Sequence, residues 1–224
     1  MPASIDALFE AIFEDNRAAA KQLLKQEPSF STRLIEQPNL ESRIHHWLYV
    51  GDTPLHAAAA AYRLEIAKLL LKSGADPRAA KNHRHSQPIH YAADGSAVSP
   101  CWNPKRQVEM IQLLIESGAD PNAQDKNGAT PLHRAVRTRC AAAVQCLLDA
   151  GADFTIQNKP GSTPFHLAVQ NTGRGGSGDP AAKQAQREII EQFLKRGVRP
   201  NLRDVNGKTV LEWARSDWIR EMLA

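Results

Sequence analysis

Two kinds of hydrophobic pattern alternate along the chain. Short alanine-rich segments, such as residues 54–61, predict thin, buried helices. Each is followed by an amphipathic segment, as at residues 64–71, whose leucine, isoleucine and alanine positions recur at helical spacing. The alternation therefore predicts short helices arranged in pairs, and the small alanine side chains allow neighbouring pairs to approach closely.

Capping residues mark the ends of these helices. A threonine precedes the first helix of a pair, and a proline occupies its first position, where no backbone amide is needed for the helical hydrogen bonds. The two residues occur together at Thr53–Pro54, Thr130–Pro131 and Thr163–Pro164. A glycine that can adopt the left-handed conformation follows the second helix, at Gly74, Gly118, Gly151 and Gly197. The turn sequences DKNG and DVNG, at 125–128 and 204–207, then predict hairpin loops between the pairs.

The helix pairs repeat with a regular period. The phrase TPLH at 53–56 recurs as QPIH, TPLH and TPFH, and its prolines stand at 54, 88, 131 and 164, with spacings of 34, 43 and 33 residues. Between them, the phrase GADP recurs in the related forms GADF and GVRP. In these motifs the chain resembles the ankyrin-repeat family over nearly its whole length. The resemblance implies an all-α solenoid of helix-turn-helix units with projecting hairpin loops, in which stacking on the neighbours stabilises each unit.

The motifs divide this single domain, 1–224, into about six units. We expect an N-terminal cap with an extended hairpin at 1–49, central repeats at 50–80, 81–123, 124–156 and 157–203, and a C-terminal cap at 204–224. The first unit lacks the TPLH phrase, and the last has Val210 in place of the proline. Such departures are typical of terminal units, whose outer faces are open to water.

Insertions interrupt the period in three places. The first hairpin is lengthened at 30–50 by apolar residues in extended-looking runs, which we expect to pack on the second unit. Two further insertions, around 95–105 and 171–185, separate the paired helices of their repeats. Trp102, in the first of these two, is either a lid folded over its own repeat or an anchor for a partner.

The last insertion contains a glycine motif that resembles a nucleotide-binding loop. The segment NTGRGGSGDP has the spacing G-x-G-x-x-G at Gly173, Gly175 and Gly178. Such a loop binds a pyrophosphate when a strand leads into it and a helix follows it. Here a predicted helix leads into the loop, so the segment is interpreted as a flexible insertion.

Composition narrows the class of protein. The net charge of +4 permits an acidic partner without requiring one. No apolar run approaches the roughly 20 residues of a membrane span, and the N-terminal stretch MPASIDALFEAIFEDN carries acids where a secretion signal carries bases. With three cysteines and no C-x-x-C pair, these features predict a cytoplasmic protein. No catalytic or cofactor motif is present, so we expect neither catalytic activity nor a cofactor. We also expect a monomer.

The histidines suggest a metal site as an alternative. Four of the eight stand in the TPLH position, which in the family is structural: His56, His90, His133 and His166. The others lie on two adjacent hairpins, as His45, His46, His83 and His85, and could converge on a zinc ion. Exposed histidines at hairpin tips that bind no metal are the simpler interpretation.

The resemblance also implies where a partner would bind. Ankyrin repeats contact partners through the hairpin tips and the exposed positions of the first helices, on a concave face. In this chain those positions are His83, Arg84, Tyr91, Asp94, Lys126, Asn127, Arg134, Arg137, Thr138, Lys159, Gln170 and Asn171.

The centre of this set is basic, because Arg134 and Arg137 lie in a stretch without acids, and arginine is suited to carboxylates and phosphates. Three interpretations stay open: a solvated face, a face for an acidic protein segment, and a face for nucleic acid or another anion that also uses the glycine loop. The basic stretch lacks interleaved aromatic residues, which argues against nucleic acid.

Overall fold

The computed structural model describes residues 4–95, 100–171 and 179–224, and the Gly173–Gly178 loop lies outside them. The described residues form twelve α-helices, one 3₁₀ helix and two short strands. In chain order these are α1 (Ile5–Phe13), α2 (Arg17–Gln26), η1 (Pro28–Thr32), β1 (Asn39–Glu41), β2 (His46–Leu48), α3 (Pro54–Ala60), α4 (Leu64–Lys72), α5 (Pro88–Ala93), α6 (Pro104–Glu116), α7 (Pro131–Arg137), α8 (Ala141–Asp149), α9 (Pro164–Ala168), α10 (Pro180–Lys195), α11 (Val210–Trp213) and α12 (Asp217–Leu223).

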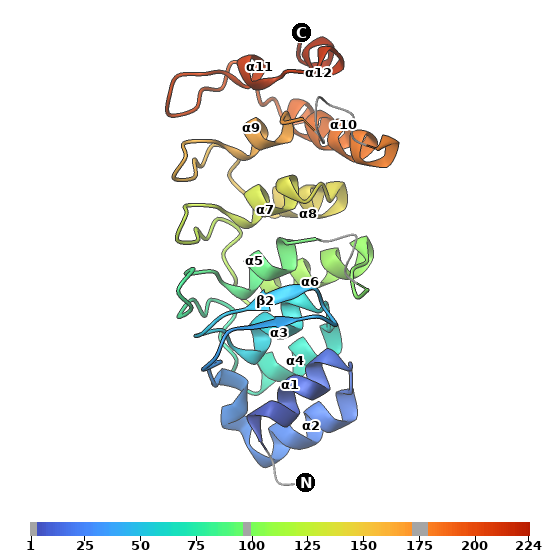
Figure 1. Cartoon of the computed structure of the whole chain (residues 1–224), viewed down its shortest axis with the longest axis vertical. Coiled ribbons are helices and arrows are strands. Elements are labelled where there is room, and N and C mark those ends of the chain that lie inside the picture. Colours follow the sequence, from blue (N-terminus) through green and yellow to red (C-terminus); the bar gives the residue numbers. More distant parts are fainter. Residues whose placement is uncertain (1–3, 96–99, 172–178) are drawn as a thin grey trace.

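The helices form a stack of pairs. In the first layer α1, α3, α5, α7, α9 and α11 each contact the next, and in the second layer α2, α4, α6, α8 and α10 do the same. The hairpin loops after each pair project to one side of the stack, as Figure 1 shows. This arrangement confirms the predicted all-α repeat solenoid. None of the helices in the described part of the chain is long and apolar enough to cross a membrane.

The histidines of the TPLH motif hold adjacent repeats together. In α3 the Nδ1 atom of His56 accepts the Thr53 amide at 3.0 Å, so its Nε2 atom carries the proton and donates to the Ser86 carbonyl of the next repeat at 2.9 Å. Equivalent bonds join His90 to the Ala129 carbonyl at 3.2 Å and His133 to the Ser162 carbonyl at 3.0 Å. The structural role implied by the resemblance is therefore confirmed for these histidines.

The long first hairpin packs across the second unit. Strands β1 and β2 pair antiparallel, with Leu40 opposite Trp47. Strand β2 packs on α3, and Ile44 and Leu48 bury their side chains beneath the hairpin. At its tip Arg43 binds both Glu41, at 2.7 Å, and Glu10 of α1, at 2.9 Å. Of the extended runs predicted for 30–50, the structure has the two short strands, which pack on the second unit as expected, whereas residues 30–32 belong to the 3₁₀ helix η1.

Candidate functional site

Two columns of side chains, one from each of two positions in the repeat, run along one side of the stack. We call the surface formed by these columns and the adjoining hairpins the inner face. The first column contains the residue after the TPLH histidine or its equivalent: Ala57, Tyr91, Arg134, Leu167 and Trp213. The second column lies three residues further along the chain, in the last turn of the helix or just beyond its end: Ala60, Asp94, Arg137, Gln170 and Ser216. This face corresponds to the predicted concave surface.

The first hairpin covers the inner face over α3 and α5. Ala57 and Ala60 of α3 are buried, and the His46 ring lies 4.7 Å from the ring of Tyr91. Tyr91 donates its hydroxyl to both oxygens of Asp52, at 2.9 and 2.8 Å. Burial and the Asp52 carboxylate both raise the pKa of Tyr91, so the phenol stays protonated. The prediction that Tyr91 is exposed is wrong, because the hairpin lies over it.

Arg134 is also buried, with only 5% of its side chain exposed. Its guanidinium donates to Asp94, Asp125 and Ser86, each at 2.7 Å. Burial is the largest single influence and by itself would raise the pKa of Asp94 and of Asp125. Arg134 opposes it in both, together with His46 and Arg137 at Asp94 and with backbone amides at Asp125, so the pKa of each carboxyl lies below its usual range. The prediction that Arg134 presents an exposed positive charge is wrong, because two aspartates of neighbouring hairpin and helix segments neutralise it.

Asp94 connects the buried cluster to the hairpin. One of its oxygens lies 2.7 Å from Arg134 and 3.8 Å from His46, and the other lies 3.2 Å from Arg137. Because three basic groups surround this half-buried carboxylate, its role in the structure is to hold the inner face together.

A hollow of about 590 Å³ opens beside this cluster, between the hairpins after α4, α6 and α8. Besides the buried Arg134, three basic side chains line it. Arg137 is 64% exposed, Lys159 is exposed, and Arg84 lies over the Tyr49 ring and donates to its hydroxyl at 2.9 Å. Among the described residues no carboxylate lies within 4.0 Å of the charged groups of Arg84 or Lys159.

The other predicted positions differ in their exposure to solvent. Lys126, Asn127 and His83 are exposed at hairpin tips, and Gln170 is exposed at the end of α9. Thr138 is half-buried and donates its hydroxyl to the Arg134 carbonyl at 3.1 Å.

Trp102 folds over its own repeat. Its indole is half-buried and donates to the Gln107 side chain of α6 at 2.8 Å. Gln107 in turn donates to the Ala92 carbonyl at the end of α5, at 3.0 Å. Of the two predicted roles, these contacts fit the lid.

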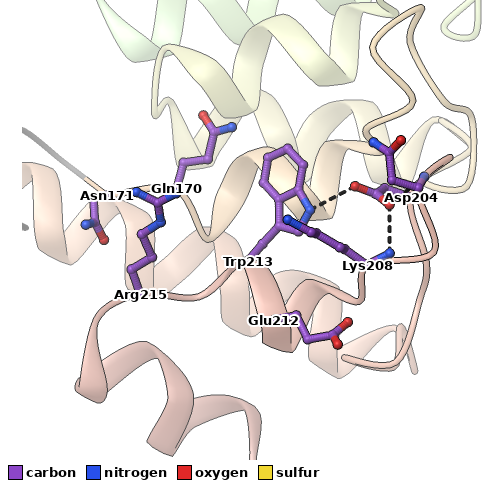
Figure 2. A pocket seen from close by; sticks show the side chains of 8 residues that line it. Gln170, Asn171, Asp204, Lys208, Glu212, Trp213 and Arg215 are labelled. Carbon is purple, nitrogen blue, oxygen red and sulfur yellow. Dashed lines mark hydrogen bonds between the residues drawn. The ribbon is translucent and has the colours of Figure 1, made fainter.

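A second hollow, of about 440 Å³, lies at the far end of the inner face (Figure 2). It contains Gln170 and Asn171, which were predicted, together with residues of the last unit, among them Lys208, Trp213 and Arg215. The sequence pattern indicates a cap for the last unit, so these residues were not among the predicted binding positions. The signal was available, because Trp213 stands in the same column as Arg134.

The hairpin histidines do not form a metal site. His46 faces Tyr91 and Asp94, whereas the His83 ring packs 4.8 Å from the ring of Tyr49. In the part of the chain that the structure describes, no group of three or more histidine, cysteine, aspartate or glutamate side chains is arranged to hold a metal ion.

Comparison with known families supports the repeat assignment. A family model of ankyrin repeats in three copies matches residues 97–176, and a model of the single ankyrin repeat matches residues 50–83. No curated protein matches the chain.

Proposed function

The chain belongs to the ankyrin-repeat family, whose repeats generally mediate binding to other proteins, and we propose that its inner face binds an acidic segment of a partner protein. In this proposal the chain acts as an adaptor, scaffold or inhibitor and has no catalytic role. The face is built of stacked helices that are already folded, which lowers the entropic cost of binding.

The hollow between the hairpins carries the proposal. Arg84, Arg137 and Lys159 surround it. The two nearby acids are already bound within the chain, since Asp125 pairs with Arg134 and Asp94 pairs with both Arg134 and Arg137. The charges of Arg84 and Lys159 are thus left without a carboxylate partner among the described residues. An incoming carboxylate would therefore meet positive charge that the chain itself leaves available. Arginine suits this role, since its planar guanidinium can donate two hydrogen bonds to one carboxylate.

Nucleic acid is a weaker candidate for the same face. Arg134 is buried and presents no charge to a ligand, whereas nucleic-acid sites combine a long basic track with aromatic side chains on which bases stack. The glycine loop that would extend such a site lies outside the described residues.

Charge reversal in the hollow tests the proposal. We expect Arg137→Glu/Lys159→Glu to weaken binding of a fluorescein-labelled glutamate peptide by about tenfold, since two attractive pairs become repulsive. Fluorescence anisotropy at constant ionic strength measures this affinity. A glutamine peptide of the same length is expected not to bind.

Lys21→Glu/Lys25→Glu is the matched control, because it makes the same change in net charge on the exposed part of α2. Equal loss of peptide binding in the two variants would show that only the net charge matters, and the proposed site would then be wrong.

A further inference from the structure

We propose that the hollow beside Trp213 is a second subsite of the inner face and takes a carboxylate side chain from the same extended acidic segment. This inference rests on the proposed function and adds to it the length and direction of the bound segment. The hollow lies between α9 and the last unit, two repeats beyond the end of the face that the hairpin covers (Figures 1 and 2).

The acidic groups at this hollow are already bound within the chain. Asp204 accepts the Trp213 indole N–H at 3.0 Å and the backbone amides of Asn206 and Lys208 at 2.9 and 2.8 Å. Glu212 accepts the Thr209 amide at 2.6 Å and so caps α11. Both carboxylates therefore serve the fold of the last unit.

The basic groups, by contrast, are available to a ligand. Lys208 and Arg215 are exposed, and among the described residues no carboxylate lies within 4.0 Å of the charged group of either. Figure 2 shows Lys208 extending alongside the indole of Trp213, whereas Arg215 points toward Gln170. A carboxylate between them would be attracted by both charges.

Trp213 provides a fixed apolar surface between these cations. The bond to Asp204 orients the indole, and the ring packs edge-on against His166 with the centroids 5.4 Å apart. The methylene groups of a glutamate side chain can pack on such a ring while its carboxylate reaches Lys208 or Arg215. Gln170, which is exposed beside them, can bond to the backbone of an extended peptide.

The geometry gives the segment a minimum length. Arg137 lies on α7 and Trp213 on α11, two repeats apart, which corresponds to on the order of 20 Å at the usual helix spacing. An extended peptide rises about 3.3 Å per residue, so about six residues join the two hollows. The hairpin over α3 and α5 prevents the segment from continuing in the other direction.

Two glutamate peptides test this inference. One of about four residues reaches a single hollow, and one of about ten residues reaches both. We expect the unmodified chain to bind the long peptide about tenfold more tightly than the short one, as two further exposed ion pairs allow. Lys208→Glu/Arg215→Glu should abolish this gain, whereas Lys21→Glu/Lys25→Glu should preserve it.

The outcomes separate the two proposals. If the short peptide binds but the gain from the long one persists in Lys208→Glu/Arg215→Glu, the second subsite is wrong and the proposed function stands. If the short peptide does not bind, or binds Arg137→Glu/Lys159→Glu as tightly as it binds the unmodified chain, the proposed function is wrong. A single-stranded oligonucleotide that displaces the long peptide at lower concentration than unlabelled peptide would assign the face to nucleic acid and overturn both.

Discussion

The half of the inner face over α3 and α5 and the half over α7, α9 and α11 are built from the same positions of the repeat, yet only the second is open. Over α3 the two columns contain Ala57 and Ala60, which leave room for the hairpin, and the hairpin buries Tyr91 on α5. Beyond α7 the columns contain larger side chains, Arg137 and Trp213 among them, and two hollows lie beside them.

The comparison shows that residue type alone does not make a binding site. Arg134 and Arg137 stand one turn apart on the same helix, but their side chains are 5% and 64% exposed. The first reaches back into the covered half, where Asp94 and Asp125 bind it, and the second extends from the open half. The boundary between the two halves therefore runs along α7.

The largest expected effect comes from removing the buried arginine. Arg134→Ala leaves Asp125 and Asp94 without their main cation, and breaking such a buried pair costs about 3–5 kcal/mol. Arg137→Ala, on the next turn, removes an exposed contact worth at most about 1 kcal/mol. Urea unfolding measures both, and equal losses would contradict the boundary drawn along α7.

The next effect is a loss of stability in mild acid. Burial, together with the charge of Arg134, lowers the pKa of His90 to about 4. The ordinary value is about 6.5, so between pH 6.5 and 4 the unfolded chain binds more protons than the folded chain, and stability falls as the pH falls. From His90 alone we expect a loss of roughly 2 kcal/mol between pH 7 and pH 5.

Urea unfolding at the two pH values measures this loss. Burial also lowers the pKa of His56, His133 and His166, so their contributions have the same sign. A stability that stays constant from pH 7 to pH 5 would show that these histidines take up protons over the same pH range in the folded chain as in the unfolded chain.

A smaller change in stability is expected when the same column position is substituted in the two halves. Ala60→Leu inserts a large side chain beneath the hairpin and is expected to cost about 1–2 kcal/mol through overpacking. Gln170→Leu places the same leucine at the matching column position of the open half, where the side chain is exposed and we expect a difference within about 0.5 kcal/mol. Thermal unfolding of the two variants decides whether the hairpin covers α3 in solution, since equal shifts would mean that it does not.

Much of the fold could be predicted because its signals are local. Threonine, proline and histidine fix the start of α3, α7 and α9 through bonds within one turn, and the glycines after the second helices have the positive φ angles expected of them, for example +95° at Gly74. The candidate site was less predictable. Arg134 was placed on the correct face, but its burial depends on aspartates 40 and 9 residues away along the chain.

The sequence by itself thus determined the repeat, the helix boundaries and the set of residues that face inward, because each follows from spacing and capping within a single unit. Only the tertiary structure decided which of those residues reach solvent. That outcome depends on the first hairpin lying over α3 and α5, on Asp94 and Asp125 meeting at Arg134, and on Trp213 joining Lys208 and Arg215 beside a hollow. The hairpin over α3 and α5 and the Arg134–Asp94 pair join different units, and the hollow beside Trp213 also needs Gln170 and Asn171 of the preceding unit. No pattern within one repeat encodes these contacts.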